Sequence, residues 1–404
     1  MRQAVMYGAG NIGRGFIGAL FSQSGYKVTF IDAADGIVAA LREKGEYPVR
    51  YVSNEGSEET LIRNVTALHA LQEDEVADAI AGCDILSTAV GVRALPLIIP
   101  NIAAGLRRRW DAGGAPLNII ICENLMNADR VVERLIKERL TEREQVLFDQ
   151  TVGLVEASIG RMVPQQTEEM KNGNPLRVCV ERYAYLPVDR AAFKGAPAEV
   201  QHMIPVSPFD FYIKRKLFIH NMSHAVCAYL GDIAGLSYIY EAVDTADIRL
   251  ITQNAMEESA LALCRRYDVS LLDLQMHIED LLHRFGNAAL RDTCRRVGAD
   301  PARKLGPSDR LIGAASLALE EGVRPAYIAA GAAAAVRRYL AEAGAEQNMS
   351  NAQNVLRDTA GLRGDAPLTL LILPFYEMLL RGASPADLRR AADEEKAKSL
   401  GNIM

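Results

Sequence analysis

The sequence lacks the signatures of disulfide-rich and metal-dependent proteins. It has no Cys-x-x-Cys pair, and its six cysteines are widely spread over 404 residues. This spacing is typical of neither a disulfide framework nor a structural zinc site. Two of the six histidines, His220 and His224, stand four residues apart, but no third ligand accompanies them. We therefore expect no metal site.

Charge of one sign and long apolar runs are also scarce. The net charge is −6, and Lys and Arg are scattered, so a basic groove for nucleic acid is not expected. No apolar run reaches the length that crosses a bilayer. The chain opens on a strand-like run, Gln3–Tyr7, and not on a charged, cleavable leader. We expect a cytoplasmic protein that binds neither nucleic acid nor membranes.

The patterns that are present predict two domains. A content of 49% hydrophobic and 24% charged residues is typical of a globular chain, and 404 residues exceed one ordinary core. In the first half, apolar runs alternate with helical patterns, which predicts a Rossmann-type, doubly wound parallel sheet. We expect strands at residues 4–7, 27–31, 85–89, 117–122 and 177–181, and helices at about 12–24 and ending near 41.

The second half is predicted to be mainly α-helical. Prolines cluster between residues 185 and 208, where no long periodic element occurs, so we place the boundary there. The alanine-rich run Ala329–Val336 predicts a closely packed helix. Apolar residues at helical spacing predict helices at 252–267, 271–285, 310–321 and 327–343. We expect a Rossmann-type domain over residues 1–200 and a helical domain over residues 201–404.

A glycine-rich turn follows the first predicted strand. Gly8 permits the tight turn, Gly10 lets a pyrophosphate approach the backbone, and Gly13 permits close packing. The pyrophosphate is expected at the N-terminus of the following helix. Asp32 ends the second strand, where its charge accepts ribose hydroxyls and repels a 2′-phosphate, so NAD is favoured over NADP. The predicted cofactor-binding residues are Gly8, Ala9, Gly10, Asn11, Ile12, Gly13, Asp32, Thr88, Ala89 and Val90.

A polar trio marks the first helix of the second half. Ser207 is expected as the N-cap, Pro208 as the first helical residue and Gly231 as the stop. Lys216, Asn221 and His224 lie among apolar residues, and about 100° per residue places all three on one side. A snorkelling lysine and a satisfied core histidine are the structural alternatives. Burying such a trio is unfavourable unless the groups are paired or used, so it is a candidate proton-transfer site.

These motifs resemble the polyol-specific long-chain dehydrogenase/reductase family, over nearly the whole chain. The spacing Lys-x4-Asn-x2-His at Lys216, Asn221 and His224 is the signature of that family. The other matching segments are Gly8–Gly18, Thr88–Gly91, Asn118–Asn124, Phe193–Gly195, Arg215–Phe218, Ala228–Gly231, Arg303–Leu305 and Asp309–Leu311.

The resemblance implies zinc-independent, NAD-dependent interconversion of D-mannitol 1-phosphate and D-fructose 6-phosphate. It makes Lys216 the general base, Asn221 and Asn124 donors to the substrate oxygen, and His224 the residue that orients a substrate hydroxyl. The chain is expected to act as a monomer or small homo-oligomer. A phosphorylated substrate requires cationic side chains that bind its phosphate. The candidate anchors are Arg14, Arg161, Lys194, Lys214, Arg215, Arg303, Lys304 and Arg310.

Two departures from the family pattern leave the polyol open. Gly160 replaces the Asp of a Val-Asp-Arg-Ile-x-Pro pattern, and the segment after Cys122-Glu-Asn124 also differs. Both lie on the substrate side. A free-polyol dehydrogenase or a hexuronate reductase (the mannitol 2-dehydrogenase, fructuronate reductase or tagaturonate reductase type) is therefore the alternative within the family. A catalytically silent dinucleotide-binding sensor is the alternative outside it.

Overall fold

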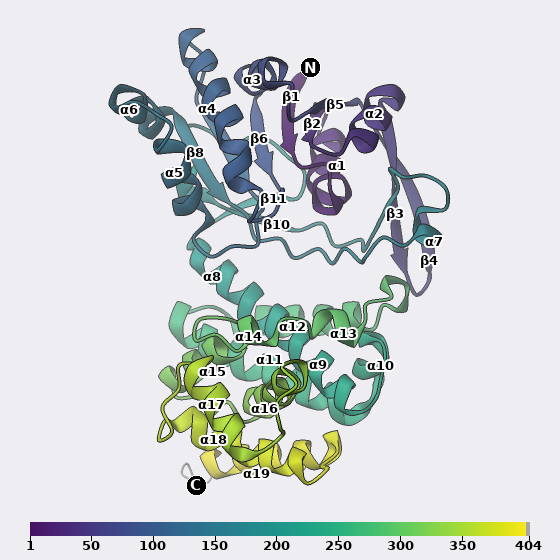
Figure 1. Cartoon of the computed structure of the whole chain (residues 1–404), viewed down its shortest axis with the longest axis vertical. Helices are drawn as coiled ribbons and strands as arrows, with labels where there is room; N and C mark the ends of the chain where they lie inside the picture. The colour runs from purple at the N-terminus through teal and green to yellow at the C-terminus, as the bar shows by residue number, and fades with distance from the viewer. Residues whose placement is uncertain (401–404) are drawn as a thin grey trace. The chain divides into compact units, whose positions relative to one another are not determined.

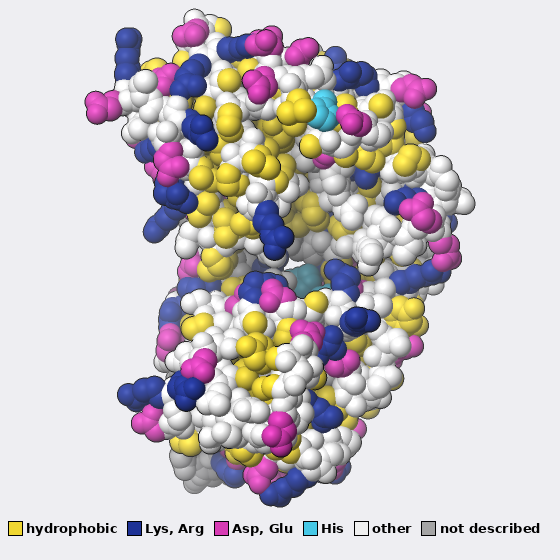
Figure 2. Space-filling model, viewed as in Figure 1, with side chains coloured by type: hydrophobic (Ala, Val, Ile, Leu, Met, Phe, Trp, Pro, Cys, Tyr) yellow, Lys and Arg dark blue, Asp and Glu magenta, His cyan; other side chains and the backbone are white. Residues whose placement is uncertain are grey.

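The computed structural model describes residues 1–400, with side chains as far as Lys398. The chain divides into two compact units, the first ending at Asp210 and the second beginning at Phe211. Figure 1 shows a layered α/β unit and a unit built of helices. On the face in Figure 2, basic and acidic side chains are interspersed over each unit. Within the described residues, no helix is both long and apolar enough to cross a membrane.

A six-stranded parallel sheet forms the centre of the first unit, as predicted. Its strand order is β5-β2-β1-β6-β7-β8, and every pair is parallel. The order reverses between β1 and β6, which is where such sheets bind ligands. The strands are β1 (Arg2–Tyr7), β2 (Tyr26–Asp32), β5 (Val65–His69), β6 (Ile85–Thr88), β7 (Leu117–Ile121) and β8 (Val152–Glu156).

Helices cover both faces of this sheet because alternate strand residues point to opposite sides. In β1, Ala4 and Met6 join the core cluster that contains Phe16 and Leu41, whereas Val5 and Tyr7 join the other cluster. The first cluster includes α1 (Gly18–Gln23) and α2 (Asp35–Lys44). The second includes α3 (Glu73–Gly82), α4 (Leu95–Asp111), α5 (Ala128–Lys137) and α6 (Glu142–Thr151).

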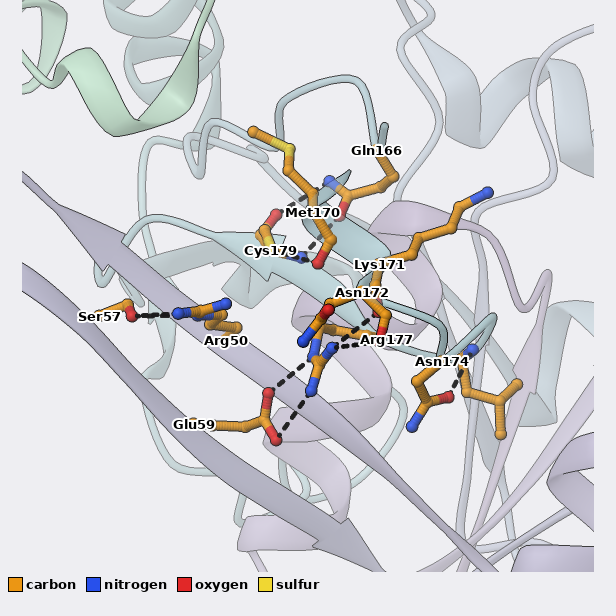
Figure 3. A network of polar contacts seen from close by, with 11 residues as sticks. Arg50, Ser57, Glu59, Gln166, Met170, Lys171, Asn172, Asn174, Arg177 and Cys179 are labelled. Carbon is orange, nitrogen blue, oxygen red and sulfur yellow. Dashed lines mark hydrogen bonds and ion pairs between the residues drawn. The ribbon is translucent and has the colours of Figure 1, made fainter. Parts of the chain in front are cut away.

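The strand predicted at residues 177–181 belongs not to the main sheet but to a smaller one, which the sequence did not predict. The hairpin β3 (Glu46–Ser53) and β4 (Gly56–Arg63) pairs through β3 with β9 (Val178–Val180). Arg177, which precedes β9, donates from its Nε to Glu59 Oε2 on β4 at 2.7 Å, and Figure 3 shows the two side chains facing each other. The Gln166 amide bonds the backbone N–H and C=O of Cys179. The unit also contains α7 (Glu168–Lys171), η2 (Arg190–Ala192), β10 (Leu186–Asp189) and β11 (Met203–Val206).

The second unit is helical, as predicted. Its Ala-rich helix α16 (Ala326–Glu342) packs so closely that a Cβ at Gly331 would overlap the side chain of Val226. The further helices are α10 (Ile239–Asp244), α11 (Ala246–Tyr267), α12 (Leu271–Phe285), η4 (Ala288–Leu290), α13 (Cys294–Val297), α14 (Pro301–Lys304), α15 (Ile312–Glu320), α17 (Met349–Asp358), α18 (Pro367–Leu380) and α19 (Pro385–Leu400).

The helix that carries Lys216 differs from the predicted single α-helix. It consists of α8 (Phe209–Lys214), a π-helical segment η3 (Arg215–Asn221) and α9 (Met222–Ile233). Pro208 precedes the first helical residue and does not occupy it. The prediction that Gly231 stops the helix is wrong, because Gly231 lies inside α9. A Cβ there would come within 2.7 Å of Cys294 Sγ and 2.9 Å of Ala242 Cβ, so this glycine serves helix packing.

Candidate functional site

The predicted glycine turn joins β1 to its helix with the expected geometry. Gly8 has φ of +102°, a conformation that favours glycine, and a Cβ there would overlap the carbonyl oxygen of Ala89. A Cβ at Gly13 would overlap the carbonyl oxygen of Gly8. Gly10 is exposed, and no protein atom lies within 4 Å of the position of a Cβ there. Protein atoms therefore leave no room for a side chain at Gly8 and Gly13, whereas the backbone at Gly10 is accessible to a ligand.

Backbone hydrogen bonds draw three strand ends together around this turn. Gly8 N donates to Ile31 O at 2.8 Å, and Ala89 N donates to Tyr7 O at 2.9 Å. Asp32 Oδ2 accepts from Ala9 N at 2.6 Å, and its Oδ1 accepts from Ala34 N. The predicted cofactor residues at Gly8–Gly13, Asp32 and Thr88–Val90 thus come together at the carboxyl edge of β1, β2 and β6, where a dinucleotide binds in this type of sheet.

Glu123 is a residue at this edge to which the sequence assigned no role. It lies two residues beyond β7 and is buried, and its carboxylate accepts from Val90 N and Gly91 N. Asn124, the predicted oxygen-binding residue, follows it with an exposed side chain. The available signal was a carboxylate two residues after a buried, mostly apolar strand.

The polar trio of the second unit lies on a π-turn. In a π-helix the backbone hydrogen bond joins residues five apart, so Lys216 and Asn221 lie one turn apart within η3. His224 follows three residues later in α9, which places it about 60° short of a full turn from Asn221. All three side chains are half-buried. The structure therefore brings the trio to one side of the helix, more closely aligned than a regular α-helix would allow.

The His224 ring is held by stacking, and its Nε2 is buried without a hydrogen bond. It stacks on Phe285 with ring centroids 4.6 Å apart and planes 16° apart. Its Nε2 is buried and makes no hydrogen bond to any described residue, although Asp292 Oδ2 lies 3.5 Å away. Arg296 binds Asp292 through two contacts of 2.7 and 2.6 Å. Buried polar atoms without a partner are rare in folded proteins, so this nitrogen is a candidate contact for a ligand.

Burial keeps the imidazole of His224 uncharged. Desolvation lowers its pKa to about 4, with Asp292 opposing the shift and Arg296 and nearby guanidinium groups adding to it. The neighbouring His220 has a pKa well below its usual value, again through burial and then through Arg284. At neutral pH these rings can therefore donate or accept one hydrogen bond but carry no charge.

Several of the predicted phosphate anchors are engaged elsewhere. Arg14 is buried and donates to the backbone oxygens of Leu176 and Pro175. Arg161 is buried, donates to Gly15 O at 2.9 Å and lies 4.4 Å over the Phe16 ring. These two guanidinium groups tie the 160–176 region to the dinucleotide helix.

The remaining candidate cations lie mostly in the second unit. Arg303 and Arg310 both pair with Asp309, and Lys214 Nζ donates to Tyr267 Oη at 2.8 Å. Lys304 is buried and contacts the carbonyl oxygen of Ala299, and burial lowers its pKa to about 8. Arg215 lies 4.8 Å over the Tyr212 ring, and the backbone N–H of Lys194 donates to Asn118 Oδ1. Among the described residues, no group of three His, Cys, Asp or Glu is arranged to hold a metal.

Known proteins resemble this chain along most of its length. The model of the mannitol dehydrogenase Rossmann domain matches residues 2–202, and that of the mannitol dehydrogenase C-terminal domain matches residues 209–371. The mannitol-1-phosphate 5-dehydrogenase of Bacillus licheniformis is 37% identical over 92% of this chain and 98% of its own length. The enzyme of the same name from Anoxybacillus flavithermus is 40% identical over 82% of this chain and 86% of its own.

A solved structure shares the fold of both units. Pseudomonas fluorescens mannitol 2-dehydrogenase, solved as a ternary complex with NAD and D-mannitol, gives a TM-score of 0.73. The two are 14% identical, with 100% of this chain and 94% of that chain covered. At this identity the likeness concerns the fold alone. It confirms the predicted Rossmann-type unit followed by a mainly helical one.

Proposed function

Because the chain belongs to the mannitol dehydrogenase family, we propose that it is an NAD-dependent oxidoreductase that interconverts D-mannitol 1-phosphate and D-fructose 6-phosphate. The observation that carries this proposal is the 37% identity to a mannitol-1-phosphate 5-dehydrogenase over 92% of the chain. The two family models together span both the glycine turn and the helix of Lys216. The geometry of each agrees with a nicotinamide-dependent redox reaction.

The first unit fits the cofactor. Gly10 leaves the backbone open to a pyrophosphate, while the first N–H groups of the helix that follows are the natural partners of its charge. Asp32 stands at the end of β2, where a carboxylate accepts ribose hydroxyls and repels the 2′-phosphate of NADP. When bound, NAD supplies the hydride acceptor.

The second unit supplies the proton chemistry. Oxidation of a secondary alcohol releases a hydride from carbon and a proton from oxygen, and Lys216 Nζ takes that proton in its neutral form. Asn221 and Asn124 donate amide N–H groups to the same oxygen as negative charge grows on it. His224 binds a neighbouring hydroxyl through its buried Nε2. No step in this scheme requires zinc.

The substrate assignment is tested by comparing D-mannitol 1-phosphate with D-mannitol. Each charge-assisted hydrogen bond to the phosphate contributes about 1.5–3 kcal/mol, so two of them raise kcat/KM roughly 100-fold or more. We expect that preference with NAD as cofactor and unchanged rates after treatment with EDTA. Equal efficiency with the two alcohols would show a free-polyol enzyme instead. Activity on a hexuronate but on neither alcohol would identify the reductase alternative.

The general base is tested with Lys216→Met, which keeps the length of the side chain and removes the amine. General base catalysis contributes about 10²–10⁴-fold, so we expect kcat to fall by that factor while the NADH Kd stays within twofold. Lys398→Met is the matched control, since Lys398 is an exposed lysine of the same unit paired with Glu395. Full turnover by a folded Lys216→Met protein would remove Lys216 from the mechanism and leave a sensor or another base to be considered.

A further inference from the structure

Glu123 connects the loops that follow two neighbouring strands, β6 and β7, at the edge of the sheet where the cofactor is expected. Its carboxylate is buried, with 8% of the residue exposed, and both of its oxygens are used. Oε1 accepts from Val90 N at 2.9 Å, and Oε2 accepts from Gly91 N at 2.8 Å. Val90 and Gly91 lie two and three residues beyond Thr88, the last residue of β6. The carboxylate therefore reaches from the end of β7 across to the loop that leaves β6.

That loop forms one side of the glycine turn. The carbonyl of Ala89 lies so close to Gly8 that a Cβ on Gly8 would overlap it, and the Val90 side chain lies 3.3 Å from the same position. Cys122 N also donates to Thr88 O at 2.9 Å. The two strand exits are thus joined first by a backbone bond and then by the Glu123 carboxylate.

A carboxylate is well suited to this position because it offers two acceptors to two adjacent N–H groups. Val90 is half-buried and Gly91 is exposed, and a loop that leaves a strand has no ladder partners for its N–H groups, so the carboxylate supplies their hydrogen bonds. Gly91 has φ of +86°, a conformation that favours glycine, so the chain can turn away directly after the second of these N–H groups. The result is a loop whose backbone is fixed before any cofactor binds.

We propose that Glu123 is a positioning residue for hydride transfer, which holds the Val90–Gly91 backbone against the cofactor turn and sets the placement of Asn124. Asn124 is the next residue along the chain, so one peptide unit links the clamp to the side chain that binds the substrate oxygen. This assignment rests on the proposed function. The new element is that one carboxylate holds the loops that follow β6 and β7. Through it, the cofactor turn and the amide of Asn124 keep fixed positions relative to each other.

The test replaces Glu123 with Gln, which keeps one acceptor and turns an NH₂ group toward the other N–H. We expect the NADH Kd to rise at least fivefold and kcat to fall at least tenfold, while KM for D-mannitol 1-phosphate stays within twofold. Asp84→Asn is the matched control, because Asp84 Oδ2 accepts from Gln3 N at 2.6 Å at the opposite end of the same sheet. A purely structural role would lower the melting temperature of both variants and leave the kcat-to-KM pattern of the folded protein unchanged, which would overturn the proposal.

Amide hydrogen exchange of the unmodified protein gives a second, independent readout. We expect the Val90 and Gly91 amides to be protected in the absence of cofactor, and rapid exchange of both would overturn the clamp. The NADH measurements need no substrate, so they test Glu123 even if D-mannitol 1-phosphate is not turned over. In that event the substrate assignment fails, but the NADH Kd of the Glu123→Gln variant still shows whether Glu123 supports cofactor binding.

Discussion

Replacing Gly10 with Ala is expected to weaken cofactor binding while leaving the fold intact. Gly10 is exposed, its φ lies outside the left-handed region, and no protein atom lies within 4 Å of a Cβ built there. The methyl group therefore meets only the space through which a pyrophosphate approaches the backbone. The methyl group should therefore clash with the bound cofactor and with no part of the protein.

The magnitude of each effect follows from these contacts. A Gly→Ala change at a compatible position stabilises a protein by about 0.4–1 kcal/mol through the unfolded chain. Displacing the pyrophosphate by a methyl radius removes one charge-assisted hydrogen bond, worth about 1.5–3 kcal/mol. The NADH Kd should therefore rise about 10- to 100-fold, since about 1.4 kcal/mol corresponds to a factor of ten.

Gly13→Ala is the matched comparison in the same turn. A Cβ at Gly13 overlaps the carbonyl oxygen of Gly8, a backbone atom that cannot move without opening the turn. We expect a loss of about 3 kcal/mol or more in the free energy of unfolding. Urea denaturation and fluorescence titration with NADH measure both quantities for both variants. An NADH Kd within twofold of the unmodified protein, in a folded Gly10→Ala variant, would refute the assignment of this turn to the pyrophosphate.

Two further predictions concern buried charged groups. Arg161→Lys loses the bond to Gly15 O and the stacking on Phe16, and we expect urea denaturation to show a loss of about 3 kcal/mol; an unchanged midpoint would contradict this. Burial raises the pKa of Glu258 to about 8, although its carboxylate accepts from Tyr327 N and Ile328 N. The folded state then binds more protons than the unfolded state between about pH 4.5 and pH 8, so this group's contribution to stability falls as pH rises through that window. Glu258→Gln should flatten the pH profile of the denaturation midpoint there, and parallel profiles for the two proteins would disprove the shift.

The four central strands of the main sheet, β2, β1, β6 and β7, could be predicted from the sequence because they are largely buried on both faces, whereas the edge strands β5 and β8 were not predicted. Such strands appear as continuous apolar runs, and Leu117–Ile121 is buried at every position. The hairpin at residues 46–63 gave no such signal, because most of β4 is exposed and its Ser57, Glu58 and Glu59 are polar. Its register depends on β3, which the pattern of β4 alone does not reveal.

The residues of the candidate site could be chosen from the sequence, but the backbone conformation that carries them could not. Strand, turn and carboxylate spacing indicated Gly8–Gly13 and Asp32, and the structure brings these residues together. The π-turn has no compositional signature, since it inserts no unusual residue, and only the five-residue spacing of Lys216 and Asn221 agrees with it. Gly231 was misjudged because glycine both ends helices and permits close helix contacts.

The π-turn sets which face of α9 packs against its neighbours. Relative to an unbroken α-helix of the same residues, it rotates every later face by about 100°. In the observed orientation Gly231 faces Cys294 and Ala242, and Val226 faces Gly331. If the same residues formed an ordinary α-helix throughout, all of these contacts would be rotated out of place together. The packing of α9 therefore favours the π-turn, independently of the side chains of Lys216 and Asn221.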